Sequence, residues 1–282
     1  MTHLSIVIVT YNSIGHIDAC LEALARHAPR IDHETVVVDN ASPDGTAEVL
    51  RRRWPAIRVI EAGANVGFAR ASNIGIRHTA GALVLLLNPD TVIRPGAIDA
   101  LAASLEATPG AAVAGPRLVD EHGRAELSFG RMIGPLAELR QKALVRGSAR
   151  GVPFVRGYVE RLTRQPRQVD WVSGACLLVR RADADAVGLL DERYFMYAED
   201  VDFCAAIRAR GRGVVFSPAA EVVHRRGGSV ASAPAATGMA YRRSQLAFYA
   251  KHHPRWAPLL RAYLKFRGRL PDMRIDPPGS TS

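Results

Sequence analysis

The chain has few cysteines and no long apolar segment. Its 282 residues include three cysteines, Cys20, Cys176 and Cys204, in unrelated apolar contexts. Because an odd number of scattered cysteines does not fit a disulfide framework, we expect buried thiols in a reducing compartment, the cytoplasm. No stretch approaches the ~18 consecutive apolar residues of a membrane span. The opening MTHLSIVIVTYN has no basic segment before its apolar run, and so predicts a first strand rather than a signal peptide.

Two common nucleotide-binding signatures are also missing. The chain contains no Gly-x-x-x-x-Gly-Lys-Ser/Thr loop, and no Gly-x-Gly-x-x-Gly follows its first predicted strand. The first absence argues against P-loop hydrolases, and the second argues against dinucleotide oxidoreductases. The composition, 48% hydrophobic and 23% charged, is typical of a globular protein, and the length allows one large or two small α/β domains.

Positive charge is concentrated in two segments. Residues 131–167 contain nine basic and two acidic residues, and residues 242–274 contain nine basic residues and one acidic residue. The rest of the chain therefore has a net negative charge, although the net charge of the whole chain is +10. Three explanations fit such segments: a nucleic-acid site, a contact with anionic lipid or a diphosphate substrate, and an arginine-rich solvated surface.

The segment ALVLLLNPDTVIRP, residues 82–95, organises the rest of the prediction. Its apolar run predicts a buried parallel strand that delivers Asn88 and Asp90 to the carboxyl edge of a sheet. Ligands of open α/β sheets bind beyond this edge, so Asp90 is a candidate ligand of a hard cation. The alternative is that Asp90 caps a helix that starts near Pro95.

Strands and helices alternate in the first hundred residues. Apolar runs predict strands over 4–9, 35–38 and 57–60, and helices follow each of them, the first two capped by Ser13 and Ser42. This order predicts an α/β fold with a Rossmann-like, doubly wound, mostly parallel sheet and flanking helices.

The later chain divides into segments of different character. Residues 1–238 are predicted as the main domain, in which 126–167 form a basic insertion or mobile acceptor-side region interrupted by glycine and proline. Short strands are predicted over 214–216 and 221–223. Residues 239–275 form a basic helical extension in two pieces broken at Pro254, and the tail 276–282 is expected to be disordered.

Acidic and polar residues at the strand ends accompany seven ordered sequence motifs. The motifs are IVIVTYNS (6–13), VVVDNAS (36–42), NVGFARASNIGI (65–76), LLLNPD (85–90), WVSGACLLVRR (171–181), FMYAEDVDFCAAIRARG (195–211) and VVHRRGGS (222–229). In these motifs the chain resembles inverting glycosyltransferases of family 2, which have the GT-A fold, and most of all their rhamnosyltransferase branch.

The resemblance implies roles for individual residues. Asp200 is the expected base that deprotonates the acceptor hydroxyl, and Asp90 and His224 are the expected ligands of Mg²⁺ or Mn²⁺. The nucleotide-sugar residues implied are Thr10, Tyr11, Asn12, Asp39, Asn65, Arg70, Asn88 and Asp90. The acceptor residues implied are Trp171, Gly174 and Glu199. For Trp171, a place in the core is an equally good expectation. Neighbouring acids at Glu199 and Asp202 are expected to raise the pKa of Asp200.

One departure from the general GT-A pattern concerns the metal. The pattern is Asp-x-Asp, whereas this chain has Asn88-Pro89-Asp90, which resembles the rhamnosyltransferase branch. The loss of one carboxylate predicts a modest metal affinity.

The implied reaction transfers a sugar, L-rhamnose from dTDP-rhamnose, to a saccharide or polyprenyl-diphosphate-linked acceptor in cell-envelope polysaccharide synthesis. The basic segments then place the protein peripherally on the inner, anionic face of the cell membrane. Alternatives are a hexosyl or galactofuranosyl transfer from a UDP-sugar, a catalytically silent nucleotide-sugar binder, and a nucleic-acid-binding protein. We do not expect nucleic acid as a partner, because the basic residues lie outside the motifs and the predicted cleft is acidic.

Overall fold

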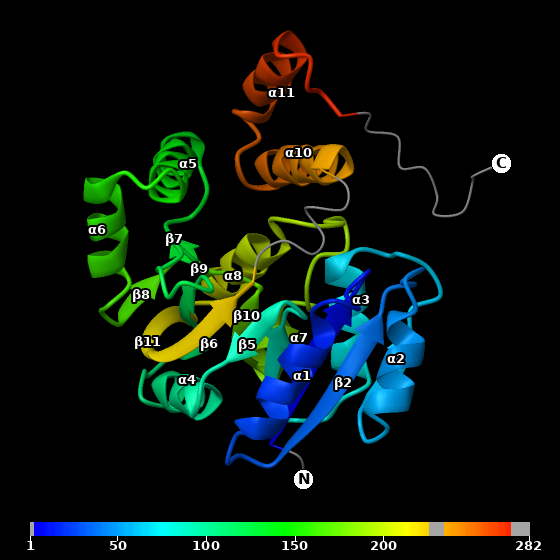
Figure 1. Cartoon of the computed structure of the whole chain (residues 1–282). Helices are drawn as coiled ribbons and strands as arrows, with labels where there is room; N and C mark the ends of the chain where they lie inside the picture. Colours follow the sequence, from blue (N-terminus) through cyan, green and yellow to red (C-terminus); the bar gives the residue numbers. More distant parts are fainter. Residues whose placement is uncertain (1–2, 226–233, 272–282) are drawn as a thin grey trace, which may run out of the picture.

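The structure, a computed structural model, describes residues 3–225 and 234–271. The predicted tail 276–282 and the end of the motif over 222–229 lie outside these ranges. Within them, nine strands form one mixed sheet in the order β3-β2-β1-β4-β10-β6-β11-β5, and β8 adds to β11. Helices cover the sheet, and α5, α10 and α11 gather on one side of it (Figure 1).

The first half of the sheet confirms the predicted alternation. Its parallel strands are β1 (Leu4–Thr10), β2 (His33–Asp39), β3 (Arg58–Glu61) and β4 (Leu83–Leu87). The helices between them are α1 (Ile17–Arg26), α2 (Thr46–Arg53) and α3 (Phe68–Arg77). All side chains of β1 and β4 are buried, as expected for central parallel strands covered on both faces.

The predicted caps of the first two helices are wrong. α1 begins at Ile17 and α2 at Thr46, several residues after Ser13 and Ser42. The hydroxyl of Ser13 turns back to the carbonyl of Tyr11, and that of Ser42 donates to Asp39 instead of capping a helix. Both serines therefore stabilise the loops at the sheet edge, where local hydrogen bonds compete with helix formation.

The second half of the sheet contains strands of both directions. They are β5 (Thr91–Ile93), β6 (Ala111–Val119), β8 (Arg167–Val169), β10 (Cys176–Arg180) and β11 (Gly213–His224). β10 runs antiparallel to β4 and β6, whereas β6 and β11 are parallel. The helices are α4 (Ala97–Glu106), α7 (Arg181–Ala186) and α8 (Glu199–Ala209). β11 is one strand where two were predicted, with an irregularity between Ser217 and Glu221.

The basic segment 126–167 is helical, although its glycines and prolines argued against regular structure. It contains β7 (Phe129–Gly130), which pairs with β9 (Trp171–Val172), then α5 (Pro135–Ala149), α6 (Pro153–Leu162) and the start of β8. Gly147 lies inside α5, where an added Cβ would come within 3.1 Å of the side chain of Val155. This glycine allows α6 to pack closely, and so serves helix packing rather than helix termination.

The C-terminal extension folds as two helices, as predicted. α10 (Pro234–His252) and α11 (Ala257–Phe266) are separated at Pro254. α10 is tied to α5 through the buried carboxylate of Glu138, which accepts hydrogen bonds from four side chains. The donors and distances are Lys142 Nζ (2.6 Å), Tyr241 OH (3.2 Å), Gln245 Nε2 (2.5 Å) and Tyr249 OH (2.6 Å). The insertion and the extension therefore form one layer. No helix in the described ranges is both long and apolar enough to cross a bilayer.

Candidate active site

A cavity of about 720 Å³ opens at the carboxyl ends of β1, β2 and β4. Its lining includes eight of the predicted site residues: Tyr11, Asn65, Asn88, Asp90, Gly174, Glu199, Asp200 and His224. Residues from six separate parts of the sequence thus meet at the sheet edge where the topology predicts a ligand site. Five other predicted residues do not line it: Thr10, Asn12, Asp39, Arg70 and Trp171.

Asp39 lies behind the lining in a fixed orientation. Its Oδ1 accepts hydrogen bonds from the hydroxyls of Thr10 (2.9 Å) and Ser42 (2.6 Å), and its Oδ2 accepts from the Ser42 amide (3.0 Å). Asn12, in the left-handed region with φ of 52°, donates its amide to the hydroxyl of Ser42. The loops after β1 and β2 are therefore tied together through Ser42.

Asn40 is a structural residue of the cavity that the sequence prediction missed. Its side-chain amide donates to Oδ1 of Asn65 (2.8 Å), and its Oδ1 accepts from the Val66 amide (2.9 Å). Gly67, next along the turn, has φ of +83°, and an added Cβ would lie 2.4 Å from the Phe195 carbonyl oxygen. The turn can approach the loop before α8 only because residue 67 is glycine.

Asp90 and His224 come together from two strands. β5 and β11 pair antiparallel, and the Arg225 amide donates to the Asp90 carbonyl (2.8 Å). The carboxylate Oδ1 of Asp90 lies 3.5 Å from Nε2 of His224. That oxygen is buried and has no well-formed hydrogen bond within the described ranges.

The charges around His224 shift two pKa values. Burial alone would lower the pKa of His224, but Asp90 and Glu126 outweigh it and raise the pKa to about 9. Burial would raise the pKa of Asp90, but the neighbouring His224 outweighs it and the pKa is lowered. Nδ1 of His224 lies 3.2 Å from Oε2 of Glu126, a second carboxylate beside the imidazole that the sequence prediction missed.

The pair Asp90 and His224 fits a divalent cation. A buried carboxylate oxygen without a good hydrogen bond faces an imidazole nitrogen at the cavity wall, and a carboxylate and an imidazole that has lost its Nε2 proton are usual ligands of Mn²⁺. No group of three or more His, Cys, Asp or Glu in residues 3–225 and 234–271 is arranged to hold a metal. Asp90 and His224 therefore stay the two candidate protein ligands.

Glu199 and Asp200 open α8 and line the same cavity. Oδ2 of Asp200 accepts from the Gly174 amide (2.9 Å) and Oδ1 accepts from the Val201 amide (2.8 Å). Burial raises the pKa of Asp200, against the lowering effect of these amides. Burial, with Asp200 close by, raises the pKa of Glu199 well above its ordinary value.

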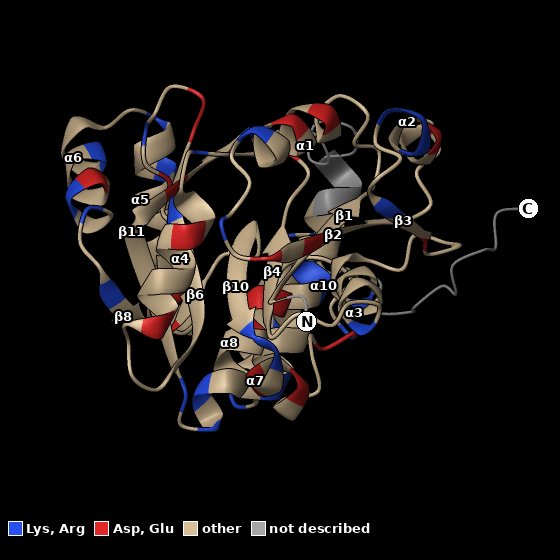
Figure 2. Cartoon of the chain, turned by 90° about the horizontal axis from the view of Figure 1, so that it is seen from below, with Lys and Arg blue, Asp and Glu red and all other residues tan. Residues whose placement is uncertain are grey.

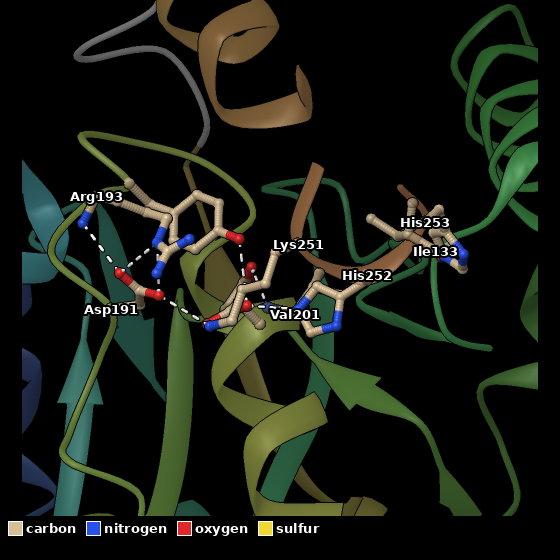
Figure 3. Close-up of polar contacts among 10 residues, drawn as sticks. Ile133, Asp191, Arg193, Val201, Lys251, His252 and His253 are labelled. Atoms are coloured by element: carbon tan, nitrogen blue, oxygen red, sulfur yellow. Dashed lines mark hydrogen bonds and ion pairs between the residues drawn. The ribbon is translucent and has the colours of Figure 1, made fainter. Parts of the chain in front are cut away.

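The expectation that Asp202 raises the pKa of Asp200 is wrong, because Asp202 interacts elsewhere. Its carboxylate contacts Tyr194 OH (3.2 Å), Lys251 Nζ (2.8 Å) and His252 Nε2 (2.6 Å). Lys251 also contacts Asp191 (Figure 3). The end of α10 is thereby fixed to the first turn of α8, one turn or less from the catalytic candidate.

Trp171 and Arg70 lie outside the cavity. The indole Nε1 of Trp171 donates to the Arg131 carbonyl (2.9 Å), and its ring packs against two apolar clusters. The side chain of Arg70 is 59% exposed and lies 3.7 Å from Glu192. Both positions favour structural or peripheral roles.

The sequence pattern of glycosyl transferase family 2 matches residues 5–188, and the chain belongs to this family. It is 35% identical over 292 residues to the N-acetylglucosaminyl-diphospho-decaprenol L-rhamnosyltransferase of Mycobacterium tuberculosis, covering 95% of this chain and 92% of that protein. The resemblance seen in the sequence motifs is thereby confirmed.

Solved structures with the same architecture identify the fold as GT-A. A crystal structure of GalNAc-T7 with UDP, GalNAc and Mn²⁺ gives a TM-score of 0.61 at 16% identity, covering 87% of this chain and 48% of that one. The structure of the mannosyltransferase PcManGT from Pyrobaculum calidifontis, with GDP-Man and Mn²⁺, gives a TM-score of 0.58 at 21% identity, covering 93% of this chain and 68% of that one.

Proposed function

We propose that the protein transfers L-rhamnose from dTDP-rhamnose, with inversion, to a polyprenyl-diphosphate-linked saccharide used in cell-envelope polysaccharide synthesis. The sugar and the acceptor class are inferred from the mycobacterial relative, which matches nearly the whole chain. The observation that supports the chemistry best is that Asp90 with His224, and Asp200, line one cavity. A site for the leaving group and a base for the acceptor hydroxyl therefore share the cavity in which donor and acceptor would meet.

The donor would lie with its diphosphate beside Asp90 and His224. A divalent cation bound there supplies Lewis-acid stabilisation of the departing diphosphate. Asp39, oriented by Thr10 and Ser42, would accept the N–H of the pyrimidine ring. The remaining proposed donor contacts come from the loops around the cavity: Tyr11, Asn12, Asn65, Asn88 and, peripherally, Arg70.

The acceptor hydroxyl would be deprotonated by Asp200. The two backbone amides that hold this carboxylate fix its direction and favour its anionic form, although burial still raises its pKa overall. The hydroxyl oxygen attacks the anomeric carbon as the bond to the diphosphate breaks, and the proton moves to Asp200. Glu199 and Gly174 are the proposed acceptor contacts in the cavity, and Trp171 is the proposed contact at its margin.

A donor titration tests this assignment. Thermal unfolding and calorimetry would be measured with dTDP-rhamnose, UDP-galactofuranose, UDP-glucose and GDP-mannose, each with Mg²⁺, Mn²⁺ or EDTA. A donor at 100 times its Kd stabilises the fold by about 2.7 kcal/mol. Metal-dependent stabilisation by dTDP-rhamnose alone is the expected result. Stronger stabilisation by a UDP-sugar would show that the donor is that sugar and not dTDP-rhamnose. The absence of a response to any nucleotide sugar would contradict the proposed function.

A further inference from the structure

α11 has two apolar faces, of which one is packed and the other is exposed. Ala257 and Leu260 pack into the cluster formed with Phe248 and Tyr249, and Leu264 is 1% exposed. A second row of large apolar side chains lies in solvent: Trp256 (50% exposed), Leu259 (60%), Tyr263 (56%) and Phe266 (89%). Their spacing of three, four and three residues places them along one side of the helix. Their exposure is not explained by packing within the chain.

The start of α5 extends this exposed apolar surface. Leu136 is 83% exposed and Leu139 is 66% exposed. The segment before α5 contacts the start of α11, because Ile133 joins the cluster of Ala257 and Leu260, and its carbonyl lies 2.5 Å from Nε2 of His253. Figure 1 shows α5 and α11 on the same side of the molecule, away from the sheet. We call the exposed apolar residues of α5 and α11 together the α5/α11 face.

Positive charge surrounds the apolar residues of this face. Residues 253–271 contain five basic and no acidic residues, and all five are exposed: Arg255, Arg261, Lys265, Arg267 and Arg269. On α5 and directly after it, Arg140, Arg146 and Arg150 are exposed, while the one acidic residue of α5, Glu138, is buried and hydrogen-bonded within the protein. An apolar row with basic neighbours and no exposed acid is complementary to a surface that is apolar inside and anionic outside.

We infer that the α5/α11 face docks on an anionic lipid bilayer. Trp256, Leu259 and Phe266 enter the interfacial region, and the arginines contact lipid phosphates. A second copy of the chain fits less well, because a symmetric contact would bring basic residues together. Nucleic acid leaves the apolar row unexplained. The docking adds a partner to the proposed function, since a lipid-linked acceptor would be met at this surface. The exposure and charge of the α5/α11 face support it independently of the proposed reaction.

Vesicle flotation tests the inference with the full chain. Phosphatidylcholine vesicles with and without phosphatidylglycerol would be mixed with the protein at low and high salt. We expect binding only to the anionic vesicles, weakened by salt. The double variant Leu259→Ser with Phe266→Ser should bind at least about tenfold more weakly, and Arg267→Gln about fivefold more weakly. The matched control Arg52→Gln, on the exposed side of α2, should bind as the wild type does.

Several outcomes would overturn the inference. They are absence of binding to anionic vesicles at low salt, and undiminished binding by the folded double variant. A wild-type dimer that the double variant dissociates would reassign the face to self-association. DNA binding that resists the apolar substitutions and exceeds vesicle binding would reassign it to nucleic acid. An Asp200→Asn protein should float with vesicles like the wild type, so failure of the reaction and failure of the docking are distinguishable.

Discussion

Asp200 is held between two backbone amides, so its position does not depend on a flexible partner. Replacing it with asparagine keeps the shape of the side chain and removes the base. We expect Asp200→Asn to lower the transfer rate by about 10² to 10⁴ fold with donor affinity unchanged. Rate measurements beside calorimetry with dTDP-rhamnose check this. A variant that keeps its full rate would show that the base lies elsewhere, and a wild type that binds donor without any turnover would support a silent binder.

The pH dependence of the reaction follows from the same carboxylate. Burial raises the pKa of Asp200, and the ionised form is the one that accepts the proton. The rate should therefore be low below this raised pKa and increase with pH through it. Since Glu199 and Asp200 are close, the acidic limb reports the pair rather than one residue. A profile of kcat/KM against pH tests this, and an acidic limb at or below the ordinary pKa of an aspartate would contradict it.

Glu126 orients the imidazole that is proposed to bind the metal. Its carboxylate lies 3.2 Å from Nδ1 of His224, which leaves Nε2 to face Asp90. Carboxylates that hydrogen-bond the second ring nitrogen of a metal-binding histidine contribute about 10- to 100-fold to metal affinity. We expect Glu126→Ala to weaken Mn²⁺ binding in the presence of dTDP by that amount, measured by electron paramagnetic resonance. Glu121→Ala, in the same loop but paired with Arg225, is the control. Equal affinities of the two variants would exclude this role.

Individual site residues differ in how well the sequence predicted them. Asp90 and His224 follow apolar runs, so strand ends that meet at one edge of the sheet predicted their proximity, whereas the place of Asp200 at the start of α8 was implied by the resemblance to the family. Asn40 and Glu126 were missed because their roles depend on side chains 25 and 98 residues away in the sequence. The orientation of Asp202 toward α10 likewise depends on a tertiary contact that no local pattern indicates.

At the scale of elements, the carboxylate of Glu138 joins the insertion to the C-terminal extension. Removing it leaves buried donors on α5 and α10 without an acceptor, which costs about 3 kcal/mol or more. We expect Glu138→Ala to increase hydrogen exchange in α5 and α10 while β1 and β4 remain protected. Glu106→Ala, an exposed glutamate at the end of α4, is the matched control. Unchanged exchange in both helices would show that apolar packing alone holds this layer.

The elements also show where sequence patterns reach their limit. The buried strands of the first half were predicted because unbroken apolar runs leave few alternatives. The helices α5 and α6 were not predicted, because glycine and proline in a sequence usually indicate loops. The packing of Gly147 against Val155, which explains one of these glycines, is visible only in the structure. The helix starts were misplaced because Ser13 and Ser42 bond to the strand-end loops instead.

At the scale of the whole molecule, charge and chemistry are separated in space. The cavity at the strand ends is lined by Asp90, Glu199 and Asp200, while the basic residues of the extension lie on helices beyond the sheet. From below, basic and acidic residues are seen on several of the helices that flank the sheet (Figure 2). This separation explains why a net charge of +10 is compatible with a cation-binding active site. The total charge alone suggests a nucleic-acid partner, because it does not show that the basic residues lie apart from the acidic cavity.

The central claim is inverting transfer by Asp200 in a single displacement. The most direct test is the stereochemistry of the product formed from dTDP-rhamnose and an N-acetylglucosaminyl-diphosphate lipid with Mn²⁺, determined by nuclear magnetic resonance. Inversion gives a rhamnosyl linkage whose anomeric configuration is opposite to that of the donor, and Asp200→Asn should form this product at least about 100-fold more slowly. A product with the donor's configuration retained would contradict this claim.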